Sequence, residues 1–294
     1  MKSCFKVLLS VLISAWATNT HAQKLPNKQE VSLRAPADIK IDGQATEWNN
    51  QYQAYNKNTE IFYTIANDDN NLYLVIHATN TRIIEKIIEG GVSFTLMADK
   101  KNTNNNIMLL FPLLSMNKAR SILVEAGKVL SENMTSPAMQ RTQPELLEKK
   151  ATSIEKANKD LLESLKEIKL NGVSVITDTV PHVNSETPYY RFLPMRDHAY
   201  KIIGINNTYN IRPMLLFDAD GSCTYELSCP IKFIGLPENN STIHYNITIN
   251  GRGADRRPND IISFAFPPAA RTMLNQDLEE ATDFSGEYTL AKNK

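Results

Sequence analysis

The chain has 294 residues, of which 42% are hydrophobic and 22% are charged, and its 32 Lys and Arg residues balance 32 Asp and Glu residues. This composition is that of an ordinary globular protein, and it excludes disordered, collagen-like and disulfide-dense chains. A formal charge of zero argues against a nucleic-acid-binding protein, which would show an excess of basic residues.

Residues 1–22 have the pattern of a secretory signal peptide. Lys2 and Lys6 come first, an apolar run from Val7 to Ala17 follows, and the segment ends on Thr-His-Ala. The run is about half of the roughly 20 residues that a membrane-spanning helix needs, and no later stretch is longer. We therefore expect an exported protein without a membrane span, in the periplasm or at the cell surface. We expect a linker over residues 23–30 and a single domain over residues 31–294.

Short β-strands come next in the chain. Residues 39–43 predict a strand that closes in an Asp-Gly turn, and Trp48 follows. Residues 60–66 and 72–78 flank a polar cluster and predict a hairpin. Further predicted strands span residues 92–97, 107–114, 173–179, 200–205, 214–217, 223–229, 243–249 and 261–266. Many short strands separated by turn signals predict an all-β fold, an antiparallel β-sandwich.

Residues 144–170 break this pattern. The segment lacks glycine, Asn158 takes its one polar core position, and the apolar residues recur at spacings of four and three: Leu147, Ala151, Ile154, Leu161, Leu165 and Ile168. This predicts an inserted amphipathic α-helix of about 27 residues. We expect it to pack along one side of the sandwich. The alternative is an apolar seam that binds a partner protein or dimerises the chain.

Two cysteines, Cys223 and Cys229, follow the predicted signal peptide. The residues between them alternate like a strand, which places their Cα atoms roughly 20 Å apart. A disulfide tolerates less than about 7 Å. We therefore expect two buried free thiols and no metal site at this pair.

Residues 67–71 and 218–221 cluster side-chain oxygens that calcium could use. Neither cluster completes a calcium loop with a bidentate acid at its end. Hairpin turns explain both clusters.

The loop over residues 250–258 is the predicted ligand site. Arg252, Asp255 and Arg256 follow a predicted strand and are accompanied by two glycines. Forked arginine donors grip carboxylates, phosphates or sugar hydroxyls, and glycine lets the backbone approach a ligand. The alternative is a solvated loop without a function.

The sequence offers no argument for an enzyme. His77, His182, His198 and His244 lie in different segments without metal-site spacing. The chain also has no G-x-S-x-G nucleophile motif.

Three segments carry a resemblance to a known family. Residues 39–48 (IKIDGQATEW) and 62–76 (FYTIANDDNNLYLVI) resemble the start of family-nine carbohydrate-binding modules and their DOMON-like relatives. Residues 221–230 (GSCTYELSCP) are similar to a later family segment, and residues 284–288 to the final strand. The resemblance implies a jelly-roll type of sandwich in an exported, non-catalytic module. Such a module binds carbohydrate or another polar small molecule and in several members calcium.

The resemblance also leaves alternatives. Family members hold the sugar between two tryptophans, whereas Trp48 is the only one after residue 22 and matches the core tryptophan of the motif. Tyr189 and Tyr190 could rebuild the clamp. A second hypothesis is a structural or interaction protein that uses the helix near residues 144–170. A third is a haem-binding protein, as some DOMON relatives are, with His77 or Met97 as an axial ligand.

Overall fold

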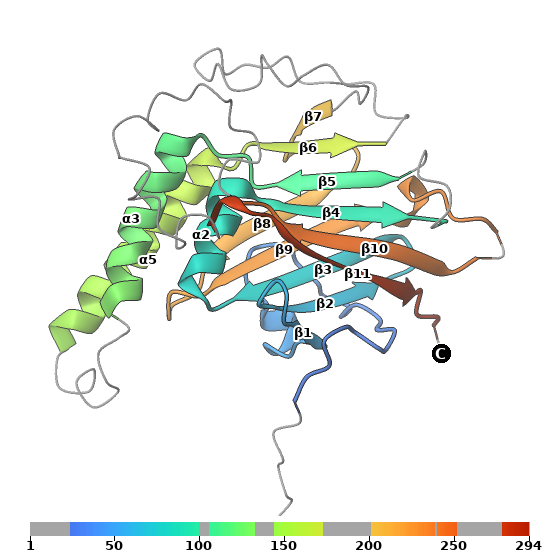
Figure 1. Ribbon diagram of the computed structural model, residues 1–294, viewed down its shortest axis with the longest axis horizontal. Helices are drawn as coiled ribbons and strands as arrows, with labels where there is room; N and C mark the ends of the chain where they lie inside the picture. The colour runs from blue at the N-terminus through green and yellow to red at the C-terminus, as the bar shows by residue number, and fades with distance from the viewer. Residues whose placement is uncertain are drawn as a thin grey trace, which may run out of the picture.

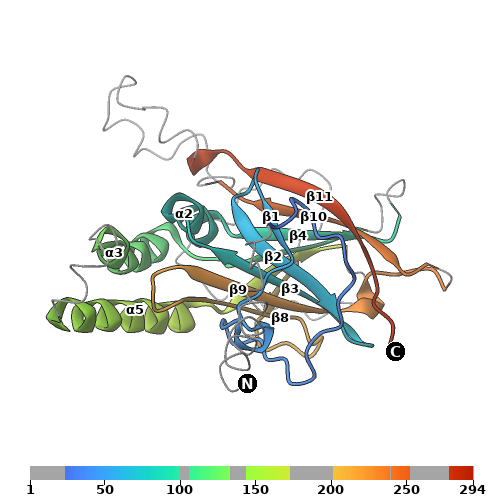
Figure 2. The same ribbon diagram turned by 90° about the horizontal axis from the view of Figure 1, so that it is seen from below.

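The computed structural model describes residues 24–99, 106–132, 144–172, 201–238, 240–251 and 278–293, with the backbone alone for 128–132 and 144–152. In these residues a five-stranded and a six-stranded antiparallel sheet pack face to face (Figures 1 and 2). The predicted antiparallel sandwich is confirmed. None of the helices among the described residues is long and apolar enough to cross a membrane.

The first sheet, called sheet A, has the strand order β1-β2-β3-β9-β8. Its strands are β1 (Ala54–Asn56), β2 (Ile61–Asn67), β3 (Asn71–Ala78), β9 (Cys223–Pro230) and β8 (Arg212–Phe217). The predicted hairpin is confirmed as β2 and β3, which pair antiparallel from Phe62–His77 to Asn67–Leu72. Both cysteines of β9 are free and buried, as predicted.

The second sheet, called sheet B, has the strand order β11-β10-β4-β5-β6-β7. Its strands are β11 (Thr282–Thr289), β10 (Thr242–Ile249), β4 (Val92–Met97), β5 (Ile107–Phe111), β6 (Glu167–Asn171) and β7 (Lys201–Gly204). The strands predicted at residues 173–179 and 261–266 lie outside the described residues.

The main core lies between the two sheets. Side chains alternate along each strand, so that every second residue points inward. Tyr63 and Tyr225 of sheet A and Phe94 and Tyr245 of sheet B are almost fully buried in one continuous cluster. The alternation that predicted strands from the sequence is therefore the pattern that fills this core.

In the described part of the chain, three helices rather than the single one predicted gather at one end of the sandwich (Figure 1). They are α2 (Thr81–Gly90), α3 (Met116–Glu132) and α5 (Pro144–Ser164). The predicted helix over residues 144–170 is too long, because its last residues form β6. In β6, Ile168 and Leu170 are buried and the backbone pairs with β5 and β7.

Helix α5 is an insertion that packs along the side of the sandwich, as expected. Ile154, Ala157 and Leu161 are buried in the main core cluster. Helix α5 packs against α3, which lies beside it (Figure 2). Asn158 donates from Nδ2 to the Phe217 carbonyl at 2.9 Å and accepts from the Phe217 N–H at 2.8 Å. Because β8 is an edge strand, this amide replaces a missing strand neighbour. The described part of the predicted apolar seam, from Ile154 to Leu161, is therefore occupied within the chain.

The segment before β1 covers the outer face of sheet A. Trp48 is 6% exposed and lies in a second apolar cluster with Tyr73 and Val75 of β3. Ile39 and Ile41 pack against the same cluster. The predicted strand over residues 39–43 is wrong, because this stretch pairs with no strand and lies on side chains of the sheet.

The covering segment begins within the predicted linker at residues 23–30. The Gln29 side chain donates to the Ile65 carbonyl and accepts from the Ile65 N–H, each at 2.7 Å. It thereby satisfies the edge of β2 beyond the short β1. We call residues 29–52 the N-terminal strap.

Candidate functional site

The predicted site residues Arg252, Asp255 and Arg256 lie outside the described residues. The structure describes the start of their loop. The Asn250 side chain donates to the Gly91 carbonyl at 3.1 Å and to Ser93 Oγ at 2.9 Å. The loop therefore leaves the sandwich at the end where α2 joins β4.

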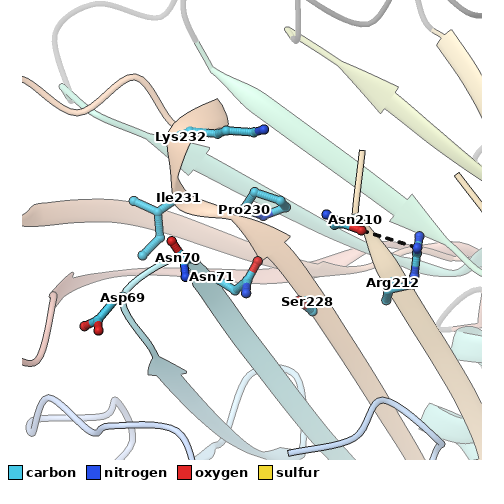
Figure 3. Close-up of a pocket in the computed structure, with 9 residues that line it drawn as sticks. All are labelled: Asp69, Asn70, Asn71, Asn210, Arg212, Ser228, Pro230, Ile231 and Lys232. Carbon is cyan, nitrogen blue, oxygen red and sulfur yellow. Dashed lines mark hydrogen bonds between the residues drawn. The ribbon is translucent and has the colours of Figure 1, made fainter. Parts of the chain in front are cut away.

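A pocket of about 560 Å³ lies on the outer face of sheet A, at the opposite end. It is formed where β3 begins, β9 ends and β8 begins (Figure 3). In this register, Arg212 pairs with Ser228 and Ser228 with Tyr73, so all three side chains share the outer face. Nine residues line the pocket: Asp69, Asn70, Asn71, Asn210, Arg212, Ser228, Pro230, Ile231 and Lys232.

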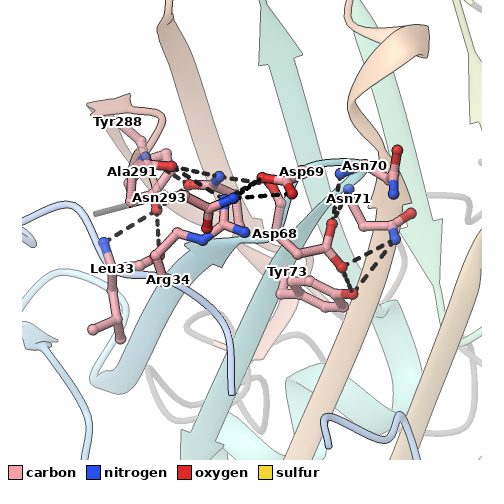
Figure 4. A network of polar contacts seen from close by, with 11 residues as sticks. Leu33, Arg34, Asp68, Asp69, Asn70, Asn71, Tyr73, Tyr288, Ala291 and Asn293 are labelled. Carbon is pink, nitrogen blue, oxygen red and sulfur yellow. Dashed lines mark hydrogen bonds and ion pairs between the residues drawn. The ribbon is translucent and has the colours of Figure 1, made fainter. Parts of the chain in front are cut away.

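The turn between β2 and β3 forms one wall of the pocket. Asp68 accepts hydrogen bonds from the backbone N–H groups of Asn70 at 2.7 Å and Asn71 at 2.6 Å, and from the Tyr73 hydroxyl at 2.6 Å (Figure 4). Burial alone would raise the pKa of Asp68, but these donors outweigh it and hold the pKa below its ordinary value. The predicted turn is confirmed, and the Asp68 carboxylate already accepts hydrogen bonds from the turn backbone and from Tyr73.

The C-terminal segment fixes the same turn from behind. Asn67 Oδ1 accepts from the Tyr288 hydroxyl at 2.9 Å and from the Ala291 N–H at 2.8 Å. Asp69 pairs with Arg34 Nη1 at 2.9 Å and accepts from Asn293 Nδ2 at 3.1 Å (Figure 4). Contacts to two separate segments of the chain, the strap at Arg34 and residues 288–293, therefore hold the turn in place.

Arg212 lies on the opposite wall and is held by the loop before β8. Its Nη1 donates to the Asn207 carbonyl at 2.8 Å and its Nη2 to Asn210 Oδ1 at 3.4 Å. The Asn207 side chain folds this loop, because it accepts from the N–H groups of Tyr209 and Ile211. Asn210 has φ of 60°, a left-handed conformation that asparagine tolerates. The guanidinium is thus positioned before any ligand arrives.

The third wall is a single 3-10 turn over Ile231–Phe233 that follows β9. The Ile231 N–H donates to the Asn70 carbonyl at 2.8 Å, which joins this wall to the β2–β3 turn. Lys232 is exposed, and its Nζ lies 5.2 Å from the centre of the Phe233 ring. The pocket therefore combines amide, hydroxyl and cationic groups on a rigid frame.

Residues 39–48 and 221–230, two of the segments that carry the family resemblance, contact each other where the strap lies on sheet A. Glu226 Oε2 accepts from the backbone N–H groups of Asp42 at 3.0 Å and Gly43 at 2.8 Å. Gly43 has φ of +82°, and a Cβ there would lie 2.8 Å from Leu216 Cγ, so the turn requires glycine. Glu226 is fully buried, and burial raises its pKa to about 7. This motif therefore attaches the strap to the sheet.

His77 lies on the outer face of sheet A, at the end opposite the pocket. Its ring stacks on Tyr52 with centroids 5.2 Å apart, and its Nδ1 lies 3.4 Å from Asp218 Oδ2. Asp218 also accepts from Thr224 Oγ1 at 2.8 Å, within the predicted turn between β8 and β9. Met97 lies on β4 of sheet B, so His77 and Met97 are on different sheets.

In the part of the chain that the structure describes, no three His, Cys, Asp or Glu side chains lie together in a way that could hold a metal ion. Tyr189 and Tyr190 lie outside that part.

Sequence analysis missed the pocket residues on β8 and β9 and in the 3-10 turn. Arg212 and Lys232 belong to no motif, and Ser228 lies in the segment at residues 221–230 without being singled out there. Comparison with known proteins adds no assignment, because no family model, curated protein or solved structure matches this chain.

Proposed function

We propose that the chain is an exported, non-catalytic binding module, a sandwich of the jelly-roll type, that captures a carbohydrate or another polar small molecule. The observation that carries the proposal is the pocket on sheet A, where polar side chains from three walls face a volume of about 560 Å³. Ligand pockets of proteins span about 300–1,000 Å³.

The fixed geometry of the pocket favours binding. Asn71, Arg212 and Ser228 are strand residues, and the turn that carries Asn70 is held by Asp68. Side chains on a rigid frame lose little conformational entropy when a ligand binds. Amide and hydroxyl groups both donate and accept hydrogen bonds, as sugar hydroxyls do. A small polyhydroxylated molecule suits this set of partners.

The test is a glycan array followed by calorimetry on the chain that starts at residue 23. Asn70→Trp is expected to fill the pocket and weaken binding at least about ten-fold, because the Asn70 side chain is exposed and lines the cavity. Asn58→Trp is the matched control, an exposed turn residue at the far edge of sheet A. Unchanged affinity in Asn70→Trp would remove this pocket from the proposal.

The same titration tests the loop at residues 250–258. If that loop holds the ligand, Arg252→Ala and Arg256→Ala should each weaken binding by about 1.5–3 kcal/mol, the range for hydrogen bonds to charged groups. A loss in these two variants without a loss in Asn70→Trp would assign the ligand to the loop. An array on which no glycan or polar probe binds would contradict the proposed function.

A further inference from the structure

The charges of the pocket are unevenly compensated. Of its nine lining residues only Asp69, Arg212 and Lys232 carry a charge. The Asp69 carboxylate pairs with Arg34, which is not a lining residue. In Figure 3 this carboxylate points away from the other labelled side chains. The negative charge is therefore neutralised from outside the pocket, and the two positive charges remain.

Neither cation has a carboxylate partner among the described residues. Arg212 donates from Nη1 to backbone carbonyls and from Nη2 to the Asn210 amide oxygen, all of them neutral acceptors. Lys232 has its ammonium near the Phe233 ring. In Figure 3 the Lys232 side chain extends toward the side of the view on which Asn210 and Arg212 lie.

The Arg212 guanidinium also has N–H donors that its contacts to described residues do not use. Arginine has five N–H donors in a planar fork. The contacts of Arg212 to described residues use Nη1 and Nη2, and they leave Nε and one Nη2 hydrogen without an acceptor there. Two adjacent N–H groups of this kind fit the two oxygens of a carboxylate or a sulfate.

We propose that the ligand of this pocket carries an anionic group, a carboxylate or a sulfate, which Arg212 and Lys232 hold together. The proposal rests on the proposed binding function and narrows its ligand to an acidic sugar or a similar acidic polar molecule. Asn70, Asn71 and Ser228 would bind the hydroxyl groups of the same molecule, because they line the pocket beside the two cations.

The experiment uses minimal anions, so that it does not depend on the identity of the sugar. Sodium acetate and sodium sulfate are titrated separately into the isotope-labelled chain from residue 23, with sodium chloride holding the ionic strength constant. NMR follows the Arg212 Nε–H signal and the backbone amides of residues 228–232. We expect a saturable shift in the millimolar range with at least one anion. A response to acetate assigns a carboxylate ligand, and a response to sulfate alone assigns a sulfated one.

Variants separate the pocket from general attraction between charges. Lys232→Ala is expected to weaken anion binding about ten-fold and Lys232→Glu to abolish the saturable shift, because the exposed Lys232 side chain supplies one of the two positive charges that line the pocket. Lys159→Ala removes one exposed charge from α5 and should leave the titration within about two-fold of the original. Arg212→Lys keeps the positive charge but loses the forked pair of guanidinium donors, and it should weaken anion binding as strongly as Lys232→Ala.

The proposal is overturned if neither anion gives a saturable shift, or if Lys232→Glu titrates like the original protein. Its failure is distinguishable from failure of the proposed function. Binding of neutral glycans alone, blocked by Asn70→Trp, would keep the function and reject the anionic ligand. Saturable anion binding with no glycan bound would keep the anion site and reject the carbohydrate.

Discussion

Replacing Glu226 by glutamine is expected to make the stability of the protein less dependent on pH. The carboxylate is fully buried under the N-terminal strap. Its Oε2 accepts from the backbone N–H groups of Asp42 and Gly43, whereas its Oε1 has no hydrogen-bond partner among the described residues. Burial raises the pKa of Glu226 from its ordinary 4.5 to about 7, although the two N–H donors lower it.

The sign of the effect follows from where the proton is held. Between pH 4.5 and about 7 the folded protein keeps a proton on Glu226 that the unfolded chain has lost. The free energy of unfolding therefore falls as the pH rises through this window. Each pKa unit corresponds to about 1.4 kcal/mol, so Glu226 should remove about 2–3 kcal/mol of stability between pH 5 and pH 8.

The assay is urea denaturation of the original protein and of Glu226→Gln at pH 5 and at pH 8. Glutamine keeps one oxygen to accept the two N–H groups, but it has no proton to lose in this range. The original protein should lose about 2–3 kcal/mol more than the variant between the two pH values. Contributions of groups that titrate alike in both proteins cancel in the difference. Equal losses in the two proteins would refute a buried, titrating Glu226.

Three further substitutions or treatments test the packing. Asn158→Ala should destabilise the protein by about 2–4 kcal/mol in urea denaturation, because the backbone of β8 loses two hydrogen bonds, while its exposed neighbour variant Lys159→Ala should change little. The fluorescence emission maximum of Trp48 should be blue-shifted, and Trp48→Ala should lower the free energy of unfolding by about 3–5 kcal/mol; a red-shifted maximum with intact stability would show an exposed indole. Cys223 and Cys229 should react with a thiol reagent only after unfolding, because burial raises both thiol pKa values, and labelling of the native chain would contradict their burial.

The elements that the sequence predicted well are those with local causes. The hairpin of β2 and β3 follows from two apolar, β-branched runs around Asp68 and Asn70, and its turn is closed by the Asp68 side chain within that turn. Asn158 is the one polar residue in the apolar repeat of α5, and the sequence pattern alone made this position visible. Its partner at Phe217, 59 residues away, was not.

The pocket could not be predicted, because it joins distant parts of the chain. Asn71, Arg212 and Ser228 come together only through the pairing of β3, β9 and β8. The uncompensated charge of Arg212 is equally a tertiary property, since it depends on which carboxylates lie near it. The predicted site at residues 250–258, by contrast, rests on the composition of the loop and on the predicted strand before it, and neither shows where the chain forms a cavity.

Residues 165–171 show most directly what the sequence by itself determined and what the tertiary structure decided. Leu165 and Ile168 continue the apolar repeat of the helix, while Ile168 and Leu170 also alternate as in a strand, so local preference permits both structures. The sequence thus determined that Ile168 would be buried, since burying an apolar side chain is favourable in either form. Only the neighbouring strands decided the form: β5 and β7 present unpaired N–H and C=O groups on both sides, and a strand at residues 167–171 satisfies them where one more helical turn would not.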